Sequence, residues 1–185
     1  MASIFTHAFA AAALGAAYGR RERPARFWML AMLLAVLPDA DVIAFLFRVP
    51  YGSTFGHRGF THSLAFALLA GLAAVALFFR RADDKPALFA FFALATASHP
   101  LLDALTNGGL GVAFFSPFND ERYFFPFRPV QVSPIGPRAF FSEWGLAVII
   151  SELLWVWLPG ALLAAAVVIW RRAAGRRKQT ADDSQ

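Results

Sequence analysis

Long apolar segments separated by short polar breaks dominate this chain. The longest apolar runs cover residues 4–18, 27–37, 61–79, 87–105 and 142–170. A bilayer crossing takes about 20 apolar residues in a helix, so the first two runs are short for complete spans. The pattern predicts an all-α protein, an integral membrane bundle of about five transmembrane or half-spanning helices.

The breaks between these runs are also informative. Pro38 and two aspartates interrupt the second run, which resumes over 42–47, and a Gly- and Pro-containing loop follows over 48–59. The connection 107–141 contains five prolines and several aromatic residues. A structureless loop of this length is unusual unless it is functional, so we expect a lid or interfacial anchor on the extracytoplasmic side.

The last apolar run predicts one further helix, and the chain after this run is basic and polar. Pro159 predicts a kink within that helix. The sequence therefore divides into a membrane-embedded domain, residues 1–170, and a basic cytoplasmic tail, residues 171–185, which its composition predicts to be disordered.

Composition supports the membrane class. Apolar residues make up 58% of the chain and charged residues 16%, against a soluble average of about 25% charged. A soluble helical protein with a large core is the alternative. The net charge of +5 would suit a nucleic-acid partner, but the basic residues cluster beside apolar runs, which favours membrane topology and no nucleic acid. The absence of cysteine excludes thiolate ligands and disulfides.

The basic residues are distributed unevenly between the two ends of the predicted helices. Alternating the helix ends puts residues 1–7, 38–62 and 99–143 on one side and 19–26, 80–86 and 171–185 on the other. Of 17 Lys and Arg, 12 fall on the second side. The positive-inside rule predicts that this side, with the C-terminus, is cytoplasmic and that the first side faces the periplasm or cell exterior.

Seven imidazole and carboxylate side chains fall on the first side, at the ends of separate helices. These candidate metal ligands are His7, Asp39, Asp41, His57, His62, His99 and Asp103. Burying so many ionisable groups costs several kcal/mol each unless a cation compensates them. A catalytic zinc usually takes three protein ligands, so seven predict two or three divalent ions, zinc first, with manganese or iron as alternatives.

Single members of this set have simpler interpretations. His7 alone would suit an interface or a helix cap, and Asp39 and Asp41 alone would suit a cap or a proton relay. His99 and Asp103 lie four residues apart on one helix face, where the aspartate can share the metal or orient the histidine.

Four further residues are candidates for chemistry beside the metals. Glu143, at the outer end of the last run, or Asp41 is the candidate general base. Arg58 and Arg122 are candidates to steady a phosphate, although lipid headgroup anchoring is the alternative for both. Glu152 is nine residues from Glu143, on the opposite side of the helix, which suits a buried hydrogen-bond partner.

Three motifs carry a resemblance to a known family. The runs LPDAD (37–41), GHRGFTHS (56–63) and SHPLLDALT (98–106), with an N-terminal histidine, resemble the YdjM-like family of predicted membrane-bound metal-dependent hydrolases of the bacterial inner membrane. The resemblance covers roughly residues 1–160, and the segment 116–126 looks like one subgroup. A fainter similarity to bacterial zinc-dependent phospholipase C implies phosphoester chemistry on a lipid.

These observations predict a membrane-embedded metallohydrolase that cleaves a phosphoester of a membrane lipid with a metal-activated water. A metal or proton transporter would use the same ligands, but it would need ionisable residues continuing toward the cytoplasmic side. A non-catalytic membrane scaffold with a structural metal would have a closed, fully coordinated site.

Overall fold

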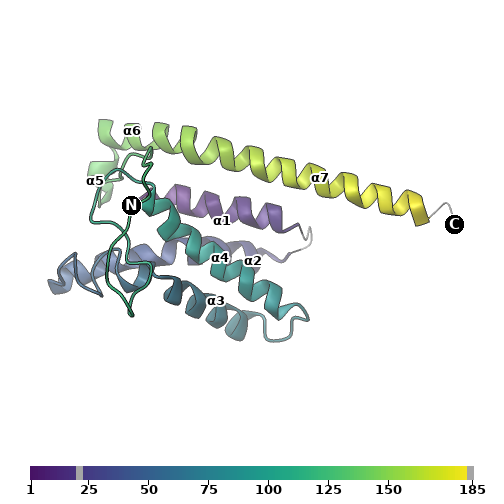
Figure 1. Cartoon of the computed structure of the whole chain (residues 1–185), viewed down its shortest axis with the longest axis horizontal. Helices are drawn as coiled ribbons and strands as arrows, with labels where there is room; N and C mark the ends of the chain where they lie inside the picture. Colours follow the sequence, from purple (N-terminus) through teal and green to yellow (C-terminus); the bar gives the residue numbers. More distant parts are fainter. Residues whose placement is uncertain (20–22, 183–185) are drawn as a thin grey trace.

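The computed structural model describes residues 1–19 and 23–182; Arg20 and Arg21, two of the predicted cytoplasmic basic residues, lie outside them. In chain order the elements are α1 (Ile4–Tyr18), α2 (Ala25–Val36), η1 (Leu37–Phe47), η2 (Phe60–His62), α3 (Leu64–Phe78), α4 (Lys85–Ala104), α5 (Pro137–Phe140), α6 (Glu143–Glu152), η3 (Leu153–Trp157) and α7 (Leu158–Asp182) (Figure 1). Over the described residues extended pairing is limited to two isolated bridges, which confirms the all-α prediction.

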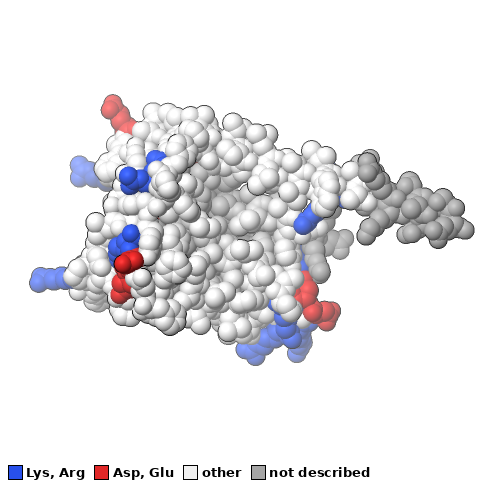
Figure 2. All heavy atoms as spheres, in the orientation of Figure 1, with Lys and Arg blue, Asp and Glu red and all other residues white. Residues whose placement is uncertain are grey.

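Three helical segments are long and apolar enough to cross a membrane: Ala25–Phe47, Lys85–Ala104 and Glu143–Ala174. The helices Ile4–Tyr18 and Leu64–Phe78 are apolar but shorter. Figure 2 shows the charged side chains of one face gathered at the two ends of the molecule, with a band free of charge between them. The predicted bundle of spanning and half-spanning helices is confirmed.

Helices α1 to α4 enclose an apolar core in the half of the bundle opposite the loops. Aromatic rings fill it, with Phe27 stacked on Phe91 at 4.5 Å between ring centroids and Phe92 beside both. Small residues bring the backbones together, and a Cβ at Gly71 of α3 would crowd the backbone of Ala93 in α4. The polar residues described below therefore lie at the other end of the same helices.

Pro38 changes the helix type where the second apolar run is interrupted. Proline has no N–H to donate, and the chain continues past α2 as the tighter 3₁₀ helix η1 rather than turning away. Asp39 and Asp41 are both buried in η1. Successive 3₁₀ residues are about 120° apart, so these two carboxylates point in different directions.

The start of α3 differs slightly from the sequence prediction. The apolar run from residue 61 first forms the 3₁₀ turn η2, and Ser63 caps α3, its hydroxyl accepting a hydrogen bond from the Phe66 N–H at 3.0 Å. This turn separates His62 from the regular helix and orients it toward the other histidines.

The C-terminal region corrects one prediction. The predicted disorder of the tail is wrong for residues 171–182, because α7 continues as a helix to Asp182. The kink at Pro159 stays a prediction. The helix has a π-helical turn over Leu153–Trp157, which ends two residues before that proline.

Candidate metal centre

The seven predicted ligands lie in one buried cluster at the loop end of the bundle. They come from α1, η1, the loop before η2, η2 and α4, and their exposed fractions run from 0 to 8%. His7, His62, His99 and Asp103 are fully buried, while Asp39 and Asp41 each keep 8% of their surface exposed. The helix ends predicted to converge therefore do so.

Four ligand atoms form the centre of this cluster. The Nε2 atoms of His62 and His99 are 3.0 Å apart, and Asp39 Oδ1 lies 3.6 Å and 3.3 Å from them respectively. Asp103 Oδ2 lies 3.6 Å from His62 Nε2 and 4.0 Å from His99 Nε2. Zinc–ligand bonds of about 2.0–2.1 Å place neighbouring tetrahedral ligands about 3.3–3.4 Å apart. The four side chains therefore fit a divalent ion held between them.

Hydrogen bonds fix which nitrogen of each histidine faces the centre. His99 Nδ1 is 2.7 Å from the Ala35 carbonyl oxygen, which can only accept, so Nδ1 carries the proton and Nε2 presents its lone pair. His62 Nδ1 lies 3.1 Å from Asp41 Oδ2, which orients that ring in the same way. Two lone pairs and two carboxylate oxygens then face one another, an arrangement that a cation stabilises.

Two residues of the cluster hold buried polar atoms without a hydrogen-bond partner. Both carboxylate oxygens of Asp39 and both ring nitrogens of His7 are in this state. His7 stacks on His99 with ring centroids 3.6 Å apart, and its Nε2 is 3.5 Å from Asp103 Oδ1. Orphaned buried polar atoms cost about 1–3 kcal/mol each or more when charged, so their presence beside the four ligands also fits a bound ion.

Asp41 has a different environment from Asp39. Its Oδ1 accepts from His57 Nδ1 at 2.6 Å, and its Oδ2 accepts from the Thr61 hydroxyl at 2.7 Å and from the Arg58 N–H at 3.2 Å, besides facing His62. Asp41, His57 and His62 are close enough to form a second metal group. These distances are those of hydrogen bonds, so Asp41 acts here as the carboxylate that orients two histidines.

Arg58 is a fully buried counter-charge. Its Nε donates to Asp103 Oδ2 at 2.9 Å, and its two terminal nitrogens donate to the Gly108 carbonyl and the Thr106 hydroxyl, each at 2.9 Å. Gly109 makes room for it, because a Cβ there would lie 2.7 Å from the guanidinium. With every branch of the fork bonded inside the protein, the structure does not support the prediction that Arg58 steadies a substrate phosphate.

Charge balance in the cluster favours a divalent ion. Asp39, Asp41 and Asp103 are buried beside two positive groups, the guanidinium of Arg58 and the amino group of Met1, so at least one negative charge stays uncompensated when the histidines are neutral. Burial alone lowers the pKa of His62, but its hydrogen bonds to Asp103, Asp39 and Asp41 raise that pKa to about 10. The carboxylates thus attract positive charge to this point, as a proton or as a metal.

The remaining predicted residues lie outside the ligand groups. Arg122 is half-buried and donates to the backbone carbonyls of His57, Tyr51 and Ser53 at 3.0–3.1 Å, so it holds the loop that carries His57. Glu143 is exposed at the start of α6 and belongs to neither group, so the structure does not support its role as general base. Glu152 is buried and accepts from the backbone and hydroxyl of Ser3, as its position predicts.

Comparison with known proteins agrees with the apolar helices. The sequence profile of the YdjM inner membrane protein family matches residues 1–176. The chain belongs to the YdjM inner membrane protein family. It is 43% identical to the inner membrane protein YbcI of Escherichia coli (strain K12) over 175 residues, which cover 93% of this chain and 99% of that protein. No solved structure matches the chain. The family and the apolar helices support a location in the inner membrane.

Some members of the site carry little signal in the sequence. The Ala35 carbonyl, Thr61 and Thr106 support ligands through hydrogen bonds that no spacing reveals. The pair Gly108-Gly109 directly after the fourth apolar run is the one local sign that a bulky side chain, Arg58, fills the space beside that helix end.

We expect replacement of Asp41 by asparagine to weaken metal binding by about 10- to 100-fold without abolishing it. The amide keeps the shape but loses one acceptor for the two imidazole N–H groups. Isothermal titration of the metal-free protein with Zn²⁺ measures the change. An unchanged affinity would contradict the orienting role, and Asp83→Asn, at an exposed position in the turn before α4, is the matched control.

Proposed function

We propose that this protein is a membrane-bound metal-dependent hydrolase that cleaves a phosphoester of a membrane lipid. The observation that carries the proposal is the group of Asp39, His62, His99 and Asp103, whose ligand atoms converge in the bundle while Asp39 keeps both oxygens unpartnered. When bound there, a divalent ion supplies Lewis acidity, which activates a water and neutralises the developing charge on a phosphoester.

Neighbouring groups of the protein hold the candidate ligands in position. His99 is held by the Ala35 carbonyl and His62 by Asp41, so both rings are fixed before any ligand arrives. Arg58 neutralises Asp103 and keeps it in place. Asp39 accepts no hydrogen bond, so the oxygen that is not used as a ligand is the best-placed proton acceptor.

The element that carries the two aspartates supports a lipid as substrate. Asp39 and Asp41 are the least completely buried of the described ligand residues, each with 8% of its surface exposed, and both lie on η1. The outward side chains of that element are apolar: Leu37, Ile43, Leu46 and Phe47 are 42–80% exposed. A molecule that approaches along η1 therefore comes from apolar surroundings, as an acyl-bearing substrate would.

The core argues against the transporter alternative. Between the cluster and the basic end, the residues buried among α1 to α4 are apolar or aromatic, with Thr96 as the described polar exception. An ion leaving the cluster toward the cytoplasmic side would meet Phe91, Phe92 and Phe27. A transit pathway needs polar groups at successive depths.

Purified protein tests the proposed activity directly. We expect hydrolysis of at least one phosphoester in a panel of phospholipids, loss of activity with a chelator, and recovery with Zn²⁺, Mn²⁺ or Fe²⁺. The same preparation tests the prediction of two or three ions by mass spectrometry. Metal without turnover on any phosphoester would support the scaffold, and metal flux into proteoliposomes would support the transporter.

The topology is a separate prediction. The basic ends of the helices predict that the C-terminus lies in the cytoplasm and the metal centre at the periplasmic or external side. An alkaline-phosphatase reporter fused after Gln185 is therefore expected to be inactive, whereas a fluorescent protein that matures only in the cytoplasm is expected to be bright. An active phosphatase fusion would reverse the orientation.

A further inference from the structure

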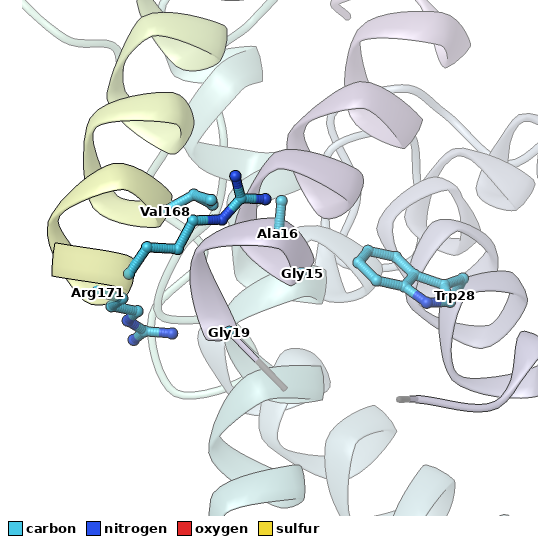
Figure 3. Close-up of a pocket in the computed structure, with 7 residues that line it drawn as sticks. Gly15, Ala16, Gly19, Trp28, Val168 and Arg171 are labelled. Atoms are coloured by element: carbon cyan, nitrogen blue, oxygen red, sulfur yellow. The ribbon is translucent and has the colours of Figure 1, made fainter. Parts of the chain in front are cut away.

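A cavity lies at the basic end of the bundle, far from the candidate metal ligands. It is a cavity of about 420 Å³ between α1, α2 and α7, a volume typical of small-ligand pockets. Figure 3 shows Arg171 of α7 on one side, Trp28 of α2 on the other, and Gly15 and Ala16 of α1 between them.

Small residues line one side of this cavity. They are Gly15 and Ala16 of α1 and Gly19, which caps that helix. The Trp28 ring packs directly on Gly15, where a Cβ would clash with it. A larger residue at Gly15 would therefore push the indole out of its place in the cavity wall.

Two arginines without acidic partners border the cavity. In the part of the chain that the structure describes, Arg171 and Arg172 make no ion pair or side-chain hydrogen bond. Other arginines at this end are engaged: Arg23 pairs with Asp84, and Arg26 lies over the Phe79 ring at 5.0 Å. The two free guanidiniums can each offer the bidentate geometry that phosphate oxygens accept.

The position of the cavity at the end of an apolar segment favours an amphiphilic ligand. Arg171 and Arg172 lie in the last turn of the apolar segment Glu143–Ala174, where that segment reaches the membrane surface. The rest of the lining, including Trp28 and Val168, is largely apolar. Trp is favoured at the headgroup level, and basic pockets between helices bind anionic headgroups.

We propose that this cavity binds an anionic phospholipid, with its headgroup phosphate at Arg171 and Arg172 and its glycerol region beside Trp28 and the small residues of α1. The site is separate from the metal centre, at the opposite end of α1 and α4. It holds a resident lipid that ties α7 to the bundle, whatever reaction the metal centre performs.

Trp28 fluorescence tests the proposal on the full-length protein in detergent micelles. Brominated phosphatidylglycerol is titrated in, and the quenching that disappears in Trp28→Phe is assigned to the cavity. We expect saturable quenching with this lipid and weak quenching with brominated phosphatidylcholine. In Arg171→Gln/Arg172→Gln the apparent affinity for phosphatidylglycerol is expected to fall by about 30-fold.

Two further variants separate the cavity from general charge effects. Arg80→Gln/Arg81→Gln removes the same charge at the same end, outside the cavity, and is expected to leave the quenching unchanged. Ala16→Phe fills the cavity from an exposed helix position and is expected to abolish the quenching of Trp28 by brominated phosphatidylglycerol. Circular dichroism checks that this variant stays folded.

Two results would overturn the proposal. One is equal quenching by the zwitterionic and anionic lipids, or an unchanged apparent affinity for phosphatidylglycerol in the folded Arg171→Gln/Arg172→Gln protein. The other is displacement of phosphatidylglycerol by inorganic phosphate at comparable concentration, which would identify a soluble anion as the ligand.

Discussion

Asp39→Asn is expected to reduce metal affinity by more than about 100-fold while the protein stays folded. Its two oxygens accept no hydrogen bond in the described structure, and Oδ1 lies 3.3 Å from His99 Nε2 and 3.6 Å from His62 Nε2. Removing a coordinating charge should exceed the 10- to 100-fold effect of outer hydrogen-bond partners. Metal content after dialysis, measured by mass spectrometry, gives the result.

The stability of the metal-free Asp39→Asn protein distinguishes a ligand from a structural residue. An orphaned buried carboxylate is unfavourable, so we expect the apparent free energy of unfolding to stay the same or rise. Asp83→Asn controls for the loss of one carboxylate elsewhere. Full metal content in Asp39→Asn, or a fold lost without metal involvement, would remove Asp39 from the centre and with it the proposed hydrolase site.

Arg58→Met is expected to lower the free energy of unfolding by about 3–5 kcal/mol. The substitution removes the buried guanidinium that is hydrogen-bonded to Asp103 and leaves the Gly108 carbonyl and the Thr106 hydroxyl without that donor. Arg58→Lys should recover part of the loss, because it restores the charge but not the three-branched contact. Thermal unfolding in detergent with a chelator present measures both.

Added Zn²⁺ and a control variant complete the test of Arg58→Met. Zn²⁺ is expected to restore part of the stability of Arg58→Met, since a cation can replace the lost positive charge beside Asp103. Arg138→Met, at an exposed position, should change stability by no more than about 0.5 kcal/mol. If Arg58→Met were as mild as this control, the buried ion pair would not be holding Asp103.

The apolar pattern was sufficient for the helices. The run 4–18 corresponds to α1 and 87–105 to α4 within two residues at each end, because the backbone of a mainly apolar segment in a membrane must satisfy its own hydrogen bonds. The same argument missed the helical tail, since the polar composition of residues 171–182 carries no apolar face but continues from a spanning helix.

The side chains that meet in the cluster could be predicted from the amino-acid sequence. Alternating helix ends brought His7, His62 and Asp103 to one level, and the cost of burying ionisable groups in apolar surroundings demanded a compensating charge. Spacing gives the end of a helix on which a residue lies. It does not give the rotation of that helix toward its neighbours.

The role of each of these side chains depends on the folded structure. Asp39 and Asp41 are two positions apart, yet the 3₁₀ turn directs one toward the Nε2 atoms of His62 and His99 and the other into a full set of hydrogen bonds. Arg58, at a backbone φ of 63°, turns inward to Asp103, while Glu143 remains exposed. Partners from distant segments set these roles, because burial and hydrogen bonding depend on what packs against a side chain and not on its neighbours in the chain.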